Sequence, residues 1–137
     1  MATPLFKKLG IKDGMAIAVF NYSQVYSQLF NEFPSDVIIS YQPTKEPIDL
    51  VHIFVSNELE LDVHFKNAKS QIKTNGVIWV SWPKKSSGIP SSIDKFDVIN
   101  YGLSQGLVDT KVAAINDIWS GHKFVIRLEN RPKKVKA

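Results

Sequence analysis

Two kinds of hydrophobic pattern alternate along this chain of 137 residues. Short unbroken apolar runs are typical of strands buried on both faces of a parallel sheet, whereas apolar positions three or four residues apart predict amphipathic helices. The runs predict strands at 15–20, 37–40, 49–55 and 77–81. The stripes predict helices over 4–9, 23–33, 57–75 and 92–105.

Polar caps, glycine and proline mark where these helices begin and end. Asn57 and Glu60 have the spacing of a capping box, and Asn75-Gly76 predicts the end of that helix. Ser23 and Pro34 bracket the second helix in the same way. Ser91 or Ser92 begins the last helix, which ends at Gly106. Its apolar stripe places Ile93, Phe96, Ile99 and Leu103 inward.

The chain closes with two predicted strands, 111–119 and 122–128. The two-residue link Ser120-Gly121 makes them an antiparallel hairpin. The earlier alternation of strands and helices predicts a mainly parallel sheet with helices on both faces. We therefore predict a Rossmann-like α/β fold with a C-terminal antiparallel hairpin, in a single domain over residues 1–128. This topology requires the loop 41–48 to recross the sheet within about 25 Å of chain.

Composition narrows the class of protein. With 44% apolar and 22% charged residues, the chain has the make-up of a globular domain. No apolar run approaches the ~20 residues of a membrane span, and the N-terminus lacks the regions of a signal peptide, so a cytoplasmic location without membrane contact is expected. The absence of cysteine excludes disulfides, thiolate nucleophiles and Cys-ligated zinc. No histidines share a metal-ligand spacing.

The net charge of +4 is confined to the C-terminal end. Residues 1–126 hold twelve lysines and twelve acids, so this part is neutral. The excess lies in the five cations of residues 127–136 against Glu129. We interpret 129–137 as a basic tail, which either stays solvated or makes weak, salt-sensitive contacts with nucleic acid.

The segment that follows the strand 77–81 is the main candidate for chemistry. Ligands of open α/β sheets bind outside the carboxyl ends of the strands. Two cations, two hydroxyls and the backbone near a glycine are suited to hold an anion there. The segment comprises Trp82, Pro83, Lys84, Lys85, Ser86, Ser87 and Gly88. In the alternative, structural interpretation, Trp82 packs on the sheet rim and the lysines face water.

Two later residues are secondary candidates. Lys111 joins the anion site only if the first strand of the hairpin runs opposite to the parallel strands; otherwise it lies at the other rim. Trp119 either contributes to the site or is an aromatic lid on the hairpin turn.

Residues 20–26, which follow the first strand, argue against a bound nucleotide or S-adenosylmethionine. Such a site needs glycines after the first strand, but this segment contains none, so bulky side chains are expected to fill the crevice. The second strand ends in Ser40-Tyr41-Gln42, without the acidic residue that holds a ribose. We therefore predict no cofactor and no catalytic residues.

Other titratable residues are assigned structural roles. We expect His52 in the core, and His64 and His122 on the surface. Asp94 and Asp97 fit a solvated helix face better than an acid–base pair.

Three motifs resemble one protein family. They are Leu9–Met15, Trp79–Lys85, which contains Trp-Pro-Lys-Lys, and Val108–Ile115 followed by Trp119-Ser120-Gly121. Together they are similar to a family of small uncharacterised bacterial single-domain proteins, which implies no established activity. A weaker resemblance is to S-adenosylmethionine-dependent methyltransferases, and it implies a truncated sheet that lacks one strand–helix unit between Ser40 and Asp49.

These observations leave three hypotheses of function. The first is a non-enzymatic module that binds an anionic ligand or partner at residues 82–88. The alternative is a divergent S-adenosylmethionine-dependent methyltransferase. The third is a protein–protein adaptor that uses the sheet edge or an exposed tryptophan patch.

Overall fold

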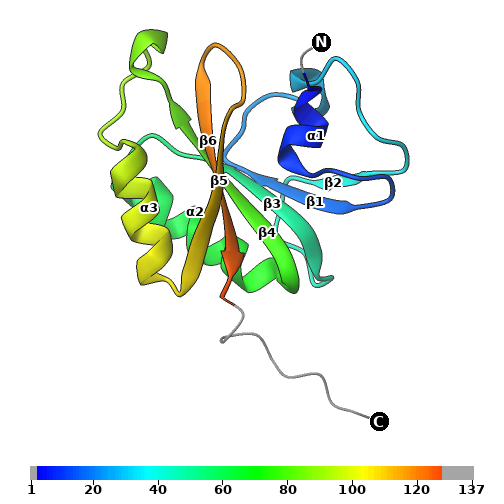
Figure 1. Ribbon diagram of the computed structural model, residues 1–137. Helices are drawn as coiled ribbons and strands as arrows, with labels where there is room; N and C mark the ends of the chain where they lie inside the picture. Colours follow the sequence, from blue (N-terminus) through cyan, green and yellow to red (C-terminus); the bar gives the residue numbers. More distant parts are fainter. Residues whose placement is uncertain (1–2, 128–137) are drawn as a thin grey trace.

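A computed structural model describes residues 3–127 as a six-stranded sheet in the order β2-β1-β3-β4-β6-β5, with helices on both faces (Figure 1). In chain order the elements are α1 (Leu5–Leu9), β1 (Ala16–Phe20), the 3-10 turn η1 (Tyr26–Leu29), β2 (Ile38–Ser40), β3 (Ile48–Phe54), α2 (Glu58–Gln71), β4 (Ile72–Pro83), the 3-10 turn η2 (Lys85–Ser87), α3 (Lys95–Ser104), β5 (Leu107–Ala114) and β6 (Trp119–Ile126). The pairs formed by β1–β2, β1–β3 and β3–β4 are parallel, and those formed by β4–β6 and β5–β6 are antiparallel. The predicted fold class is confirmed.

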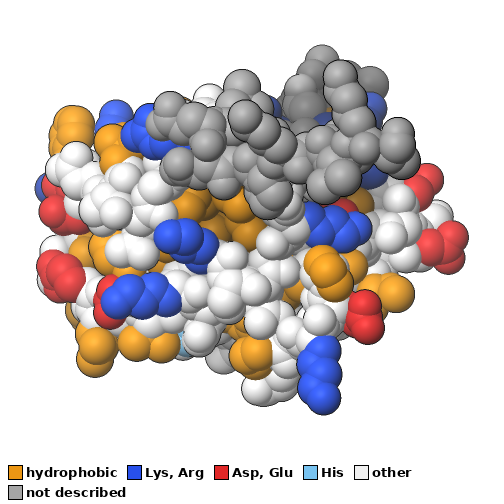
Figure 2. Space-filling model, turned by 90° about the horizontal axis from the view of Figure 1, so that it is seen from below, with side chains coloured by type: hydrophobic (Ala, Val, Ile, Leu, Met, Phe, Trp, Pro, Cys, Tyr) orange, Lys and Arg blue, Asp and Glu red, His pale blue; other side chains and the backbone are white. Residues whose placement is uncertain are grey.

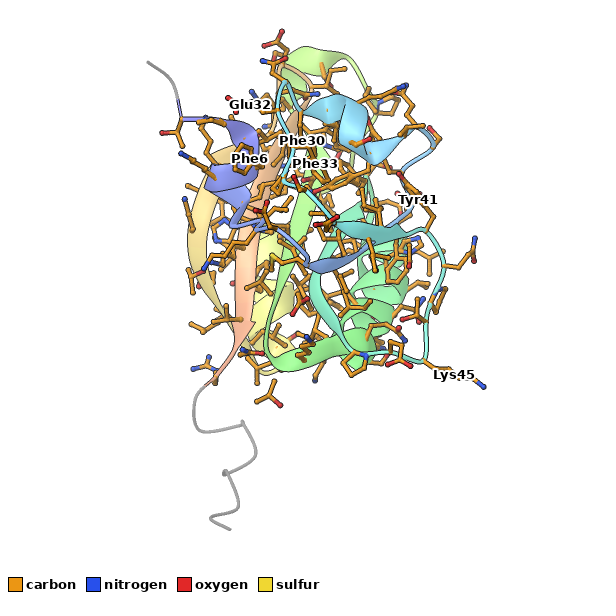
Figure 3. All side chains as sticks on the ribbon, turned by 90° about the vertical axis from the view of Figure 1, so that its right-hand side faces the viewer. Phe6, Phe30, Glu32, Phe33, Tyr41 and Lys45 are labelled. Carbon is orange, nitrogen blue, oxygen red and sulfur yellow. The ribbon has the colours of Figure 1, made fainter. Side chains whose placement is uncertain are left out.

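The connection between β2 and β3 recrosses the sheet, as the sequence predicts. Both strands lie parallel to β1, one on each side of it. Figure 3 shows this connection running from Tyr41 down the outer edge of the molecule to Lys45. It is tied to the end of α2, because the Thr44 backbone N–H donates to Gln71 Oε1 over 2.9 Å.

Alternate residues of the strands feed two separate cores. On the face covered by α2 and α3, the core contains Phe20, Ile53, Phe65, Val80 and Phe124. On the face covered by α1 and the segment 21–37, it contains Leu9, Ile17, Tyr26, Phe54 and Trp79. Burial on both faces explains why the central strands read as unbroken apolar runs. None of the helices between residues 3 and 127 is both long and apolar enough to cross a membrane.

The predicted helix over 23–33 is wrong, since only the single turn η1 forms there. The apolar stripe reflects burial of individual aromatic side chains in an irregular segment. The Tyr26 hydroxyl reaches the buried ring nitrogen of His52, while Phe30 packs on Phe33 with ring centroids 4.8 Å apart (Figure 3). Val25, a member of the predicted stripe, is exposed. No side chain caps the turn.

Two further helix boundaries differ from the prediction. Helix α2 ends at Gln71, and Gly76 lies inside β4. The position favours glycine, because an added Cβ would lie 3.0 Å from the Lys73 carbonyl oxygen and 3.1 Å from that of Ile48, closer than an ordinary van der Waals contact. Helix α3 is capped by Asp94, and Phe96 points outward with 66% exposure instead of lying inward.

The hairpin turn is also displaced from the predicted position. Trp119, Ser120 and Gly121 belong to β6, so the turn is residues 115–118. The side chain of Asn116 closes the turn by accepting hydrogen bonds from the backbone N–H groups of Ile118 (2.8 Å) and Trp119 (2.9 Å). Gly121 serves packing instead, because a Cβ would lie 2.8 Å from Ile115 Cδ1.

Candidate functional site

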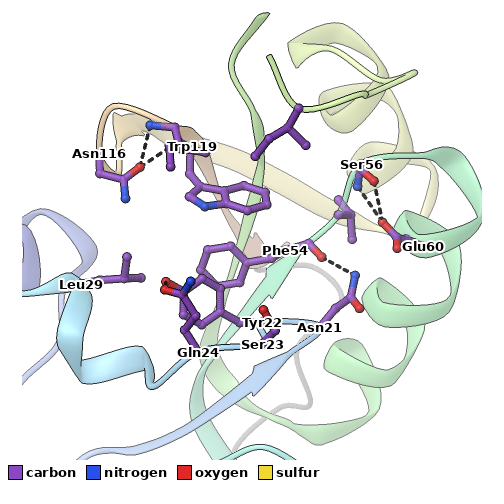
Figure 4. Close-up of a pocket in the computed structure, with 13 residues that line it drawn as sticks. Asn21, Tyr22, Ser23, Gln24, Leu29, Phe54, Ser56, Glu60, Asn116 and Trp119 are labelled. Carbon is purple, nitrogen blue, oxygen red and sulfur yellow. Dashed lines mark hydrogen bonds between the residues drawn. The ribbon is translucent and has the colours of Figure 1, made fainter. Parts of the chain in front are cut away.

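A cavity of about 510 Å³ opens at the carboxyl ends of β1 and β3, and we call it the crevice (Figure 4). The chain leaves β1 toward the face of η1 and leaves β3 toward the opposite face, which is covered by α2. Diverging connections of this kind create ligand crevices in open α/β sheets. The lining comprises Asn21, Tyr22, Ser23, Gln24 and Leu29 from the first connection, Phe54, Val55, Ser56 and Glu60 from β3 and α2, and Ile89, Asn116, Ile118 and Trp119 from two neighbouring loops.

The expectation that bulky side chains fill this space is wrong. Asn21 has a left-handed backbone (φ 68°), and its side-chain amide donates to the Phe54 carbonyl over 2.8 Å. The Tyr22 ring lies against the Phe54 ring, with centroids 4.4 Å apart. Both side chains are therefore held against the end of β3 and form walls of the cavity (Figure 4).

Three aromatic rings shape the crevice. Phe54 contacts Tyr22 on one side and meets Trp119 edge-on at 5.1 Å on the other. Trp119 is held by the hairpin turn through Asn116. Phe54 is only 1% exposed, whereas Tyr22 and Trp119 are half-buried. The accessible parts of the Tyr22 and Trp119 rings provide surfaces on which a flat ligand can stack.

Glu60 is the one fully charged side chain among the described residues of the lining. Its Oε1 accepts from the backbone N–H (2.8 Å) and the hydroxyl (3.0 Å) of Ser56. Partial burial acts to raise the pKa of Glu60, but hydrogen bonds from Ser56 and Asn21 outweigh it and hold the pKa below its ordinary value. The carboxylate is therefore ionised at neutral pH, and the crevice is a negative, partly aromatic site.

The lysines of residues 82–88 face a different hollow, of about 290 Å³. Trp82 and Pro83 are the last residues of β4, and Trp82 is only 7% exposed. Lys84 and Lys85 line the hollow with Lys95, a cation that no sequence motif singles out. Asp94, the cap of α3, adds one carboxylate to the same lining.

The hydroxyl and glycine positions of this segment have local roles. Ser87 Oγ donates to the Lys84 carbonyl over 2.6 Å and accepts from the Ile89 N–H. Ser86 is exposed, and Gly88 takes the left-handed conformation (φ 78°) that ends η2. The structure thus brings together Trp82, Lys84 and Lys85, while the hydroxyl of Ser87 stabilises its own turn.

Lys111 does not join this hollow. It lies within β5, which is antiparallel to β6 and therefore parallel to β4, and its ammonium group donates to the Lys8 carbonyl over 3.1 Å on the α1 face of the sheet. Trp119 lies in the crevice instead. The three tryptophans are buried or half-buried, so they form no exposed patch for an adaptor.

The burial of two of the three histidines differs from the sequence prediction. His52 is fully buried as expected. His122 is also buried (5% exposed), 3.3 Å from Asp109, and not at the surface. His64 is half-buried against the Phe20 ring. Between residues 3 and 127, no three His, Asp or Glu side chains gather as a metal site would require.

Residues 6–128 match the family described as "Protein of unknown function (DUF3052)". The chain belongs to this family. The match covers most of the chain and confirms the resemblance carried by the Trp-Pro-Lys-Lys and Trp-Ser-Gly motifs. No curated protein matches the sequence.

Several solved structures share the fold of this DUF3052 protein. An S-adenosylmethionine-dependent methyltransferase from Aquifex aeolicus superposes with a TM-score of 0.59 at 12% identity, covering 89% of this chain and 88% of that one. TrmN from Thermus thermophilus superposes with a TM-score of 0.55 at 6% identity, covering 90% of this chain and 47% of that one. A protein of the NADB-Rossmann superfamily from Streptococcus agalactiae gives 0.52 at 9% identity, covering 89% and 67%. The chain thus spans about half of TrmN, and at these identities the likeness shows the fold alone.

Proposed function

We propose that this protein is a non-enzymatic binding module whose principal ligand occupies the crevice. The observation that carries this proposal is the 510 Å³ cavity at the carboxyl ends of β1 and β3, with aromatic walls and one ionised carboxylate. Cavities of this size accept small molecules. About half of the lining is polar, with Asn21, Ser23, Gln24, Ser56, Glu60 and Asn116 beside the aromatic and aliphatic side chains, so a ligand there can be held by hydrogen bonds as well as by ring contacts. Among the described residues of its lining there is no histidine, lysine or arginine.

The chemistry of the lining selects the ligand. The half-buried rings of Tyr22 and Trp119, which pack on the buried Phe54, favour a flat ring system. Glu60 attracts a positive charge and repels a phosphate or carboxylate, because no cation among the described lining residues offsets it. The ligand class is therefore a flat, neutral or cationic molecule.

The likeness to methyltransferases raises the question of S-adenosylmethionine. The residues do not match the usual cradle, since Asn21 and Tyr22 stand where glycines approach that cofactor and Ser40 replaces the acid that holds its ribose. Because of this mismatch, no residue is assigned a role in methyl transfer. Equilibrium dialysis with labelled S-adenosylmethionine tests this alternative, and saturable uptake would favour it over a non-enzymatic module.

Calorimetric titration with a series of flat ligands tests the proposal. Adenosine, 1-methyladenosine and adenosine monophosphate carry no charge, a positive charge and a negative charge, respectively, on one ring system at neutral pH. In the Lys84→Ala/Lys85→Ala background, which removes two lysines of the other hollow, we expect adenosine or 1-methyladenosine to bind and adenosine monophosphate to bind more weakly, with the order weakened by Glu60→Gln. Glu58→Gln is the matched control, because Glu58 belongs to the same helical turn but contacts Ser92. Failure of the whole series to bind, or unchanged binding in Glu60→Gln and Trp119→Leu, would contradict the proposal.

A second candidate is the anion site predicted at residues 82–88. The observation that favours it is the gathering of Lys84, Lys85 and Lys95 around one hollow. Lys84 and Lys85 against Asp94 leave a net positive charge, which suits a phosphate or a carboxylate. Lys95 adds to this charge, although its ammonium group lies over the Phe96 ring, 5.3 Å from the ring centroid. Calorimetry with phosphate-containing metabolites tests this site. Identical binding by the wild type and Lys84→Ala/Lys85→Ala would mean that these lysines do not hold the anion.

A further inference from the structure

A pair of lysines faces across the antiparallel ladder of the C-terminal hairpin. Lys111 of β5 stands directly opposite Lys123 of β6. The register shifts between Asp109 and Lys111, which leaves Thr110 as the extra residue of a β-bulge. Without that bulge, regular alternation would put Thr110 opposite Lys123 and send Lys111 to the other face. The bulge is therefore what brings the two ammonium-bearing side chains to one side of the sheet.

Both lysines lie on the face of the ladder that is contacted by α1. Lys111 Nζ donates to the Lys8 carbonyl over 3.1 Å. Lys123 is in register with Trp79, whose indole N–H donates to the next carbonyl, that of Leu9, over 3.0 Å. The C-terminal end of α1 therefore presents the carbonyls of Lys8 and Leu9 to this side of the ladder.

Like charges directly opposite each other destabilise a strand pair. Among residues 3–127 the ion pairs join Lys66 to Asp62, Lys73 to Asp49 and His122 to Asp109, and none of them involves Lys111 or Lys123. Partial burial, and then the charge of Lys111, lower the pKa of Lys123. Lys111 supports α1 through its hydrogen bond to the Lys8 carbonyl. This contact does not explain why a second lysine, Lys123, stands opposite Lys111.

We propose that Lys111 and Lys123 form a binding site for a phosphate-type oxyanion on the α1 face of the hairpin. An oxyanion between two ammonium groups relieves their repulsion and accepts charge-assisted hydrogen bonds from both. The bulge sets both lysines on the same face before the anion arrives, and the Lys8 carbonyl holds the ammonium group of Lys111. This site is separate from the crevice and from the hollow beside Lys84 and Lys85, which open at the ends of the strands.

Thermal unfolding in phosphate against chloride at equal ionic strength tests the proposal. A ligand that binds the folded state raises the melting temperature, so millimolar phosphate is expected to stabilise the wild type. Lys123→Gln, which leaves the Lys111–Lys8 contact intact, is expected to weaken phosphate binding by about tenfold or more. Lys69→Gln is the matched control, because Lys69 also donates to a backbone carbonyl, that of Gln105, but faces no second lysine. Equal stabilisation of wild type and Lys123→Gln would overturn the proposal, and so would the absence of any effect in the wild type.

The same unfolding experiment with other ligands distinguishes whether the site binds a small phosphate-containing metabolite or a nucleic-acid backbone. Pyrophosphate and adenosine monophosphate represent small metabolites, and a single-stranded oligonucleotide represents a nucleic-acid backbone. Lys133→Gln/Lys134→Gln separates this site from the basic tail, which lies outside the described residues. Oligonucleotide binding that is lost in this tail variant but retained in Lys123→Gln would assign the binding to the tail and contradict the hairpin site.

Discussion

His52 Nε2 lies 2.6 Å from Ser81 Oγ, in the interior of the sheet where both side chains are fully buried. The other ring nitrogen of His52 meets the hydroxyl of Tyr26. This chain of three polar groups links β3, β4 and the turn η1. Because each group has a partner, the core tolerates them, and the segment that forms one wall of the crevice is anchored to the sheet.

The first prediction is that stability falls in mild acid. Burial lowers the pKa of His52 to about 3, whereas in the unfolded chain it stays near 6.5. As the pH falls below 6.5, the unfolded state takes up a proton that the folded state does not, so the free energy of unfolding decreases by up to about 1.4 kcal/mol per pH unit. Above pH 6.5 this contribution is constant. Urea unfolding at several pH values measures the slope.

His52→Gln is expected to flatten this slope while retaining a hydrogen-bonding side chain. His64→Gln is the control. The pKa of His64 is also lowered by burial, but this residue is only half-buried and has Glu60 nearby to oppose the shift. The same slope in His52→Gln and the wild type would show that another group controls the acid response.

The second prediction concerns the packing of α3 on the sheet. A Cβ added at Gly102 would lie 2.1 Å from Cε1 of Phe124, a residue of the core. Gly102→Ala is therefore expected to destabilise the fold by about 1–3 kcal/mol, although alanine is the better helix former. Ser104→Ala, at an exposed position of the same helix, is the control. Phe124→Leu in the Gly102→Ala background should restore part of the loss, and additive effects of the two changes would refute the contact.

Much of the fold follows from the sequence because both faces of the central strands are covered. Continuous apolar runs at 15–20 and 49–55 correspond to β1 and β3 within one residue at each end. The same logic fails over 23–33, where the stripe of aromatic residues is buried without being helical. The pattern there indicates burial correctly, but it does not determine the local conformation.

The crevice could not be predicted from the sequence, for a different reason. Its existence depends on the connections after β1 and β3 leaving toward opposite faces, which no local pattern reports. From their size alone, Asn21 and Tyr22 are expected to fill the cavity. The sequence does not show the contacts with Phe54 that hold both side chains at its wall. Glu60 stands out solely by its capping-box spacing with Asn57, and the structure confirms that Asn57 Oδ1 accepts from the Glu60 N–H over 2.9 Å.

The third prediction separates the two roles of Asp94. It forms a reciprocal capping box with Asp97, so Asp94→Ala is expected to lower the midpoint of urea unfolding, whereas Asp94→Asn keeps the accepting oxygen and lowers it less. Asp94 is also the carboxylate beside Lys84, Lys85 and Lys95. If these lysines hold an anion, Asp94→Asn should tighten phosphate binding there. Urea unfolding and calorimetry measure the two effects, and weaker anion binding in Asp94→Asn would count against the site.

The last prediction concerns how the hairpin turn places the indole of Trp119 in the crevice. Asn116 Oδ1 accepts from the N–H groups of Ile118 and Trp119, so Asn116→Ala removes the acceptor for both. We expect amide hydrogen exchange at these two residues to accelerate by about tenfold, the equivalent of roughly 1.4 kcal/mol, while Asn116→Asp keeps it slow. The Trp79 amide in the centre of β4 is the internal reference. A flat ligand that stacks on Trp119 should then bind more weakly to Asn116→Ala than to Asn116→Asp, because the indole has lost its fixed position. Equal affinity in both variants, despite faster exchange, would mean that the ligand does not contact Trp119 and would move the binding surface toward Tyr22 and Glu60.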